Sequence, residues 1–544
     1  MSASDHPISR RQFLGQASCA GVGASALFST LLSLRLANSL AAQTTSSDYK
    51  ALVCLFLAGG NDSFNMLVPH TAAEHASYSS IRGNLALARD TLLQISPGNL
   101  GGRTLGIHPS MTEVRNLFNA GRLAFVSNVG SLVRPTTLAD YRANRYRPVS
   151  LYSHADQIKQ WQTCMPDQRT AIGWGGRAAD IIRSLNAPSL VSMNISLSGQ
   201  NTFLTGQQAF TYTVGSAGAT ALTGYSPTAA NSLNALRTAA IDSNLGADYQ
   251  SLFEKSFADT TSTAVDAYYE FTAAINGINL TTTTIPSGNS LASNLAMVAR
   301  IAASNSRLGA RRQVFFVQYG GWDHHDEVVN NQVNMLRTVS QGVDTFWSAL
   351  GEFGLQNNVT LFSASDFGRT LSSNGNGSDH AWGGNHFVLG GSVRGGNVYG
   401  NRDQGYYPNF QNLAPIDTGQ GRLIPGTSVD EYARDMLSWF GVSNGDMDYV
   451  LPAFSSRFGG REALGLMGAG AATNTPSTPT TPTTPTPTVP TTPAPSTGSS
   501  GGGGGGGSLG ALTTVGLGSL LLLKKIADRK KKAAAEEAAA TPKT

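Results

Sequence analysis

Residues 51–63 read ALVCLFLAGGNDS: an apolar run, two glycines and then three polar side chains. The run Ala51–Leu57 is short and unbroken, which is typical of a strand buried on both faces of a sheet. Four later runs have the same character: Leu123–Asn128, Val314–Tyr319, Val359–Ser363 and Phe387–Leu389. The chain is therefore expected to build its core around a buried sheet.

Helical patterns separate several of these runs. Thr112–Ala120, Val328–Phe353 and Glu431–Phe440 carry apolar residues at helical spacing. Strands that alternate with helices predict an α/β fold with a doubly wound, mostly parallel sheet. We assign this domain to residues 43–470. Within it we expect a helical and loop insertion at about 196–310, where the sequence is rich in Thr, Ser and Ala.

Asp and His side chains follow the predicted strands. In a doubly wound sheet, ligands bind at the carboxyl ends of the strands, so the segments that follow those ends are the place to look. These segments contain Asp62, Asp323, His324, His325, Asp366, Asp379, His380 and His386. Imidazole and carboxylate groups bind zinc, manganese and iron. We therefore expect a metal site at this edge; the competing interpretation is that these residues only cap helices and form turns.

The positive charge of the chain lies at its two ends. The formal net charge is +4, yet residues 1–42 and 508–544 hold the excess of Lys and Arg, and the stretch between them is slightly acidic. Such a domain is not expected to bind nucleic acid. Cysteine is sparse: Cys54 and Cys164 form at most one disulfide, and Cys54 lies in an apolar run that favours a buried thiol.

The first residues predict export. Ser9–Leu14 reads SRRQFL, which fits the twin-arginine pattern, and an apolar segment and the small residues Ser39–Ala41 follow. We interpret residues 1–42 as a signal peptide that the twin-arginine translocase recognises. That translocase carries folded cargo, so a metal ion bound in the cytoplasm would travel with the protein.

The last residues predict a stalk and a sorting signal. Residues 471–507 are rich in Thr, Pro and Gly and end on Gly501–Gly507, a composition typical of a disordered linker. Ser508–Leu523 is apolar but only sixteen residues long, so as a helix it would rise about 24 Å, less than the roughly 30 Å of a bilayer core. With the basic residues up to Thr544, this tail resembles the GlyGly-CTERM sorting tail. The resemblance implies a transient transmembrane helix, a rhombosortase-type protease, type II secretion, and a final place at the cell surface or outside the cell. The alternative is a simple C-terminal anchor.

Five ordered motifs in the central domain resemble one family. They are Gly59–Pro69, Leu151–Gln162, Gly321–His325, Ser365–Thr370 and Asp379–Gly396. Together they resemble the family called domain of unknown function 1501, which is placed near the alkaline phosphatase and sulfatase superfamily. The resemblance implies an alkaline phosphatase-like fold and hydrolysis at two divalent metal ions, zinc being favoured and manganese or calcium being the alternatives.

The same resemblance implies the ligands. One ion would be bound by Asp62, Asp379 and His380, and the other by Asp323, His325 and His386. His324 is an alternative to His325, and Asp366 either binds metal or supports a ligand.

The resemblance also implies a hydroxyl nucleophile at the start of a helix. Ser153 precedes the expected helix Ala155–Cys164, whose first backbone N–H groups would hold an anion. The alternative is that Ser153 only caps this helix. Ser63 and Thr136 or Thr137 are rival hydroxyls.

The expected function is that of an exported metal-dependent hydrolase of phosphate or sulfate esters, acting on a small anionic ester or a glycan. The alternative is a non-catalytic binding module of the cell envelope that retains a degenerate hydrolase fold.

Overall fold

The computed structural model describes residues 49–228, 232–452 and 454–468. Its main sheet has nine strands in the order β11-β5-β10-β9-β1-β8-β6-β7, with β12 also paired to β5. The strands are β1 Lys50–Ala58, β5 Leu123–Gly130, β6 Asn194–Ser196, β7 Thr211–Thr213, β8 Arg312–Gly320, β9 Val359–Ser365, β10 Gly384–Leu389, β11 Val398–Tyr399 and β12 Thr427–Ser428. Only β10 runs antiparallel to its neighbours, so the predicted mostly parallel α/β sheet is confirmed.

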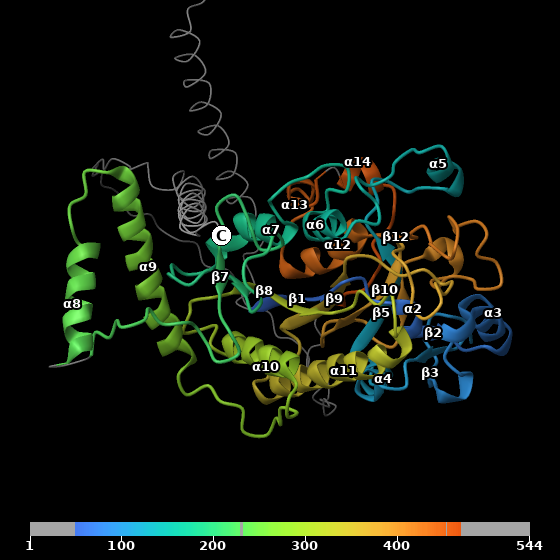
Figure 1. The fold of residues 1–544 in the computed structure, drawn as a ribbon, viewed down its shortest axis with the longest axis horizontal. Coiled ribbons are helices and arrows are strands. Elements are labelled where there is room, and N and C mark those ends of the chain that lie inside the picture. The colour runs from blue at the N-terminus through green and yellow to red at the C-terminus, as the bar shows by residue number, and fades with distance from the viewer. Residues whose placement is uncertain (1–48, 229–231, 453, 469–544) are drawn as a thin grey trace, which may run out of the picture. The chain divides into compact units, whose positions relative to one another are not determined.

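The strand β1 shows why the sheet is covered on both faces. Its side chains are almost fully buried, and alternate residues enter two separate cores. Val53 and Leu55 pack into the core that contains α4 (Thr112–Asn119), α10 (Ser290–Ala303) and α11 (Val328–Glu352). Cys54 and Phe56 pack into the core that contains α6 (His154–Thr163), α7 (Trp174–Ile182) and α12 (Val429–Phe440). Figure 1 shows these two helical layers on opposite sides of the sheet.

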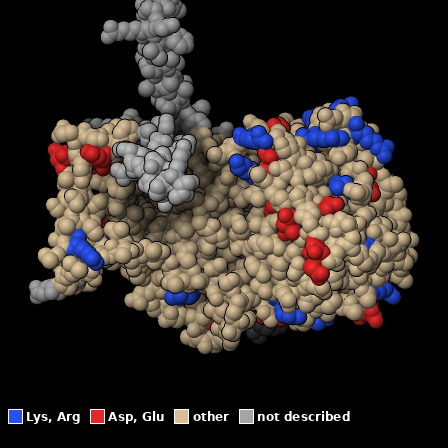
Figure 2. All heavy atoms as spheres, in the orientation of Figure 1, with Lys and Arg blue, Asp and Glu red and all other residues tan. Residues whose placement is uncertain are grey.

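The remaining elements are small and lie mostly before β5 or after β10. A second sheet has three strands, β2 Leu67–Pro69, β3 Leu93–Ile95 and β4 Leu105–Ile107. The short helices are α2 Ser63–Met66, α3 Ala72–Arg82, α5 Leu138–Arg142, α13 Met447–Val450 and α14 Phe454–Phe458. Charged side chains are sparse on most of the face in Figure 2, and Lys and Arg gather over the region of α5.

The chain divides into two compact units. Among the described residues, the larger unit contains 49–222 and 265–468 apart from 453, and the smaller contains 223–264 apart from 229–231. The helix α8 (Leu233–Leu245) lies in the smaller unit, and α9 (Leu252–Ile275) begins in it. Within the range 196–310, where an insertion is predicted, β7 belongs to the main sheet and α10 packs against α11.

The described part of the chain has no helix that is both long enough and apolar enough to cross a bilayer. The predicted signal peptide 1–42, stalk 471–507 and apolar segment Ser508–Leu523 lie outside the described residues. Cys54 and Cys164 are both free and buried, which confirms the prediction of a buried thiol at Cys54.

Candidate metal centre

Loops from three parallel strands meet at the carboxyl edge of the sheet. They follow β1, β8 and β9. Because β10 is antiparallel, the segment that precedes it reaches this same edge, and that segment contains Asp379 and His380. One reversed strand therefore brings a fourth polar segment to the edge that the parallel strands define.

The loop after β1 needs a glycine where it approaches the loop after β8. Gly59 has a φ of +121°, a conformation that residues with a side chain rarely adopt. A Cβ atom at this position would lie 2.6 Å from the backbone nitrogen of Asp323. Gly59 thus allows the two loops to touch along their backbones.

The buried side chain of Arg369 joins all of these loops. Its Nε donates to the carbonyl of Gly60 at 2.8 Å, its Nη1 to the carbonyl of Ser378 at 2.9 Å, and its Nη2 to the carbonyl of Gly59 at 2.6 Å. The same Nη2 also contacts Oδ1 of Asp323. A guanidinium presents several donors in one rigid plane, so a single residue fixes the relative positions of the loops.

Three side chains point metal-binding atoms at one another. His154 Nε2 lies 3.1 Å from His380 Nε2, and these two atoms lie 3.5 Å and 3.4 Å from Oδ1 of Asp323. In the described part of the chain these three residues form the one group of at least three His, Cys, Asp or Glu that could hold an ion, and we call them the metal group. His325 adjoins the group, with its Nε2 at 2.9 Å from His380 and 3.1 Å from Asp323.

The outer nitrogens of these imidazoles fix their tautomers. Each Nδ1 faces an oxygen: His154 faces Asp366 Oδ2 at 2.6 Å, His325 faces Asp379 Oδ1 at 3.2 Å, and His380 faces the backbone oxygen of Tyr152 at 2.8 Å. Carboxylate and carbonyl oxygens only accept hydrogen bonds, so each Nδ1 carries the hydrogen. In the neutral imidazoles each Nε2 then has a lone pair directed into the group. Metal-binding histidines in proteins are held in this same way.

The spacing of the ligand atoms fits zinc. A tetrahedral zinc ion with bonds of about 2.0–2.1 Å places neighbouring ligand atoms about 3.3 Å apart. The three separations in the group of His154, Asp323 and His380 are 3.1, 3.4 and 3.5 Å. Unprotonated nitrogens this close repel one another unless a cation lies between them. Calcium prefers an all-oxygen shell, so two imidazoles favour zinc or manganese over calcium.

The electrostatics of the group act on the two imidazoles in opposite directions and favour the charged carboxylate of Asp323. The hydrogen bond to Asp366 raises the pKa of His154 above its ordinary value, whereas burial lowers the pKa of His380. Burial alone would raise the pKa of Asp323, but the Arg369 guanidinium, together with His154 and His325, outweighs burial and holds this pKa below its ordinary value. The side chains of Asp323 and His325 are 48% and 47% exposed, so one side of the group is open to solvent.

Asp62, predicted as a metal ligand, lies in a different environment. Its buried Oδ2 forms an ion pair with Arg82 at 2.7 Å and accepts a hydrogen bond from the Ser378 hydroxyl at 2.9 Å. Arg82 is itself fully buried and also donates to the carbonyl of Thr370. Asp62 is thus neutralised by a guanidinium and fixes the backbone near the site, and the structure does not bring it into the metal group.

His386 is also outside the group. It is the third residue of β10 and is buried in the core beneath α6 and α12, with its ring centroid 4.6 Å from that of Trp161 and 6.1 Å from that of Tyr432. Burial lowers the pKa of His386 to about 3, so the imidazole is neutral. Its position inside the strand, rather than before it, turns the side chain into the core.

Ser153 is the residue before α6, at the helix N-terminus. Its hydroxyl donates to Asp156 Oδ2 at 3.0 Å, and Asp156 accepts a second hydrogen bond from Arg169 at 2.7 Å. His324, the alternative to His325, is buried, and its Nδ1 lacks a hydrogen-bond partner. In each case the next residue along the chain reaches the group instead: His154 rather than Ser153, and His325 rather than His324.

Of the predicted metal ligands, Asp323 and His380 belong to the group, His325 adjoins it, and Asp379 contacts Nδ1 of His325. The sequence prediction misses His154. The motif that drew attention to Ser153 contains His154 as its next residue. The signal that would have indicated His154 is a histidine at the first position of the helix α6, in the segment that follows the carboxyl end of β5. The prediction also leaves Asp366 open between ligand and support, and the structure places it as the support of His154.

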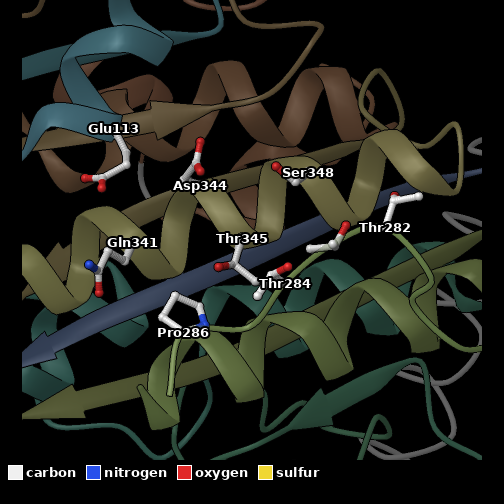
Figure 3. Close-up of a pocket in the computed structure, with 9 residues that line it drawn as sticks. Glu113, Thr282, Thr284, Pro286, Gln341, Asp344, Thr345 and Ser348 are labelled. Atoms are coloured by element: carbon white, nitrogen blue, oxygen red, sulfur yellow. The ribbon is translucent and has the colours of Figure 1, made fainter. Parts of the chain in front are cut away.

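A cavity of about 510 Å³ lies elsewhere, on the α11 side of the sheet (Figure 3). It is lined by Glu113, Thr282, Thr283, Thr284, Pro286, Gln341, Asp344, Thr345 and Ser348. None of these residues belongs to the metal group.

The family match covers the part of the site that follows residue 203, and therefore not His154. Residues 203–416 match a family described as "Protein of unknown function (DUF1501)". This range contains Asp323, His325, Asp366, Asp379 and His380, so the resemblance noted from the motifs is confirmed there. The search of the curated proteins found no match.

Solved structures similar to this chain are distant. They include the lipoteichoic acid synthase LtaP from Listeria monocytogenes, at 8% identity over 74% of this chain and 76% of that chain, with a TM-score of 0.28. The C-terminal periplasmic domain of EcEptC from Escherichia coli matches at 12% identity over 76% and 88%, with a TM-score of 0.27. A mutant of the alkaline phosphatase PafA matches at 12% identity over 60% and 64%, with a TM-score of 0.22. These scores are low, and the assignment of the site rests on its own geometry.

Proposed function

We propose that this chain is a metal-dependent hydrolase of phosphate or sulfate esters. The supporting observation is the group of His154, Asp323 and His380, which combines three convergent ligand atoms with an exposed side. Catalytic zinc sites have three protein ligands and leave one position for water or substrate, whereas structural zinc sites are closed by four. The exposed side therefore favours a catalytic site over a structural one.

The surrounding residues suit hydrolysis of an anionic ester. A bound zinc ion would polarise an ester oxygen and lower the pKa of water. Asp379 orients the imidazole of His325, so the exposed His325, once its Nε2 is also protonated, is placed to give that proton to the departing oxygen. Arg422 donates to the carbonyl of His380 at 3.0 Å and so brings a guanidinium beside the group, where it would attract the anionic ester.

The proposal differs from the two-metal expectation in its nucleophile. The hydroxyl of Ser153 is bonded to Asp156, and Asp62 is paired with Arg82. Neither is oriented for an alkoxide held between two ions. Water is therefore the proposed attacking group, at a site of one ion.

Metal content and ester hydrolysis test the proposal together. The full chain, purified from the producing cells without chelator, is expected to contain one zinc ion per chain by mass spectrometry. It is expected to hydrolyse at least one of 4-nitrophenyl phosphate, bis(4-nitrophenyl) phosphate and 4-nitrophenyl sulfate. The variant His380→Ala should lose both the metal and about 100-fold or more in activity.

Asp326→Asn is the matched control. Asp326 is exposed in the same loop as Asp323 and His325, and its side chain bonds to Asn376 rather than to the group. This variant should keep metal and activity. A folded, zinc-loaded chain that hydrolyses none of the three esters would instead support the alternative, a non-catalytic binding module.

We further propose that the protein works outside the cytoplasm. The support is the twin-arginine pattern at Ser9–Leu14 and the sorting-like tail after Gly507. Mass spectrometry of the extracellular protein should find neither residues 1–42 nor Lys524–Lys532. An extracellular form that still contains Lys524–Lys532 would contradict removal of the tail.

A further inference from the structure

The segment between β5 and α6 carries an excess of arginine. Residues 134–147 contain Arg134, Arg142, Arg145 and Arg147 but only one acidic residue, Asp140. The first three arginines are exposed. Asp140 pairs with Arg145 at 2.7 Å. We call these fourteen residues the arginine loop; Figure 2 shows Lys and Arg gathered over this region of the surface.

The arginine loop is held in a defined conformation. The guanidinium of Arg147 lies 3.9 Å from the ring centre of Tyr141 and donates to the carbonyl of the same residue. The guanidinium of Arg134 lies 4.9 Å from the ring centre of Tyr146. Tyrosine rings carry no formal charge, so these contacts position the guanidinium groups and leave their positive charge available to an anion.

The backbone of this region is strained. Asn144, Tyr146, Ser150 and Tyr152 all have positive φ angles, between 48° and 76°. Residues with side chains rarely adopt this conformation, and such strain concentrates at functional sites. The positive φ angles extend from the arginine loop to Tyr152, two positions before His154.

Hydrogen bonds connect the arginine loop to the metal group. The hydroxyl of Tyr141 lies 3.1 Å from the hydroxyl of Tyr152. The backbone oxygen of Tyr152 accepts the Nδ1 hydrogen of His380 at 2.8 Å. Arg422 lies over the ring of Tyr152, at 5.6 Å from its centre, and donates to the carbonyl of His380. The arginine loop therefore lies next to the metal group. Arg422 contacts both Tyr152, which borders the loop, and His380.

We propose that the arginine loop binds the neighbouring anionic groups of a polysaccharide ester, while one ester of the same chain occupies the metal group. A single sulfate or phosphate would be neutralised at the group by the ion and Arg422. Exposed arginines beyond the rim suit further anions on a longer substrate. This inference rests on the proposed function and adds to it the substrate class: a glycan chain that carries repeated sulfate or phosphate esters.

The tyrosines argue against single-stranded nucleic acid. Proteins that bind it stack bases on aromatic faces. Here Tyr141, Tyr146 and Tyr152 each have an arginine over the ring. The loop therefore offers guanidinium groups rather than an open aromatic platform.

Binding of labelled dextrans to the full chain tests the inference. The probes are dextran sulfate, dextran phosphate and uncharged dextran of equal length; the first two distinguish the source of the anion. Arg142→Gln/Arg145→Gln should weaken binding of at least one charged dextran about tenfold. The single variant Arg142→Gln changes an exposed side chain and should also weaken binding of charged dextran. It replaces the double variant in the test if the double variant folds poorly.

The control has the same change of charge on the other face of the sheet. Arg115→Gln/Arg337→Gln alters α4 and α11, which cover the face opposite α6, and should bind as the unaltered chain does. Equal dextran affinity in the two double variants would overturn the inference. So would binding of an oligodeoxynucleotide as tightly as dextran sulfate through the same arginines.

Kinetics separate this inference from the proposed function. For Arg142→Gln/Arg145→Gln the KM for ester groups on dextran should rise about tenfold, while the KM for a 4-nitrophenyl ester stays unchanged. Failure of the unaltered chain to hydrolyse any ester would contradict the proposed function. The dextran-binding result is measured without turnover and would still decide the role of the arginine loop.

Discussion

The Nδ1 atom of His154 lies 2.6 Å from Oδ2 of Asp366, and Asp366 is almost fully buried. The bond turns Nε2 of His154 toward His380 and Asp323. Asp366 also accepts a hydrogen bond from the backbone of Gly59 at 3.0 Å. The carboxylate therefore orients a candidate metal ligand and is itself held in place by the loop after β1.

Asp366→Asn should weaken zinc binding about 10–100-fold, because an amide is a poorer acceptor for the imidazole and no longer supports its basicity. Competition with a chromogenic zinc chelator measures this affinity. Asp326→Asn is the control in which the affinity stays unchanged. An Asp366→Asn protein that binds zinc as tightly as the control would show that Asp366 does not support His154.

Asp62→Asn should unfold more easily without losing its metal. The substitution leaves Arg82 as an unpaired charge in a fully buried position, which costs about 3–5 kcal/mol of unfolding free energy. Urea unfolding measures the loss, and zinc content per folded chain should stay at the unaltered value. A folded Asp62→Asn protein that contains less zinc would show that Asp62 contributes to metal binding after all.

Ser153→Ala should leave kcat and zinc content unchanged. The hydroxyl of Ser153 donates a hydrogen bond to Asp156. In the proposed reaction water, rather than this hydroxyl, attacks the ester. Steady-state hydrolysis of the best 4-nitrophenyl ester measures kcat. A folded, zinc-loaded Ser153→Ala protein without turnover would favour a serine nucleophile.

Stability should fall as the pH rises from about 4 to about 8 because of Asp430, in the first turn of α12. This carboxyl group is fully buried, and burial raises its pKa from 3.8 to about 8. Between these values the unfolded chain has lost the proton and the folded chain keeps it. The unfolded state binds fewer protons, so the free energy of unfolding falls by up to ~1.4 kcal/mol per pH unit.

Asp430→Asn lacks this titration. Relative to the unaltered protein, its free energy of unfolding should rise steadily from pH 5 to pH 8, measured by urea unfolding in the presence of chelator so that metal binding does not contribute. Parallel pH profiles for the two proteins would contradict the assignment to Asp430.

The sheet could be predicted from sequence because its signal is local. Runs such as Ala51–Leu57 and Val359–Ser363 are apolar at every position, which is the pattern of a strand covered on both faces. The side chains of β1 pack alternately into two cores, which explains that pattern. The reversal of β10 has no such local signal, because it depends on which neighbours a strand pairs with.

The site could be predicted only in part because ligands are chosen by partners far away in the chain. Asp62 looks like a ligand in sequence, and what removes it from the group is Arg82, twenty positions later and on another element. His386 follows the Asp379–His380 pair closely, yet it already lies inside β10 and faces the core. The neighbours Ser153 and His154 differ by one position, and only the start of α6 decides which of them reaches the edge.

The four contacts of Arg369 have a consequence for motion. Gly59, Gly60, Asp323 and Ser378 belong to three separate segments, and one guanidinium ties them all. None of these segments can swing away from the edge without breaking charged hydrogen bonds that also hold the others. The candidate metal centre is thus a single cooperative unit in which backbone amides should exchange their hydrogens together.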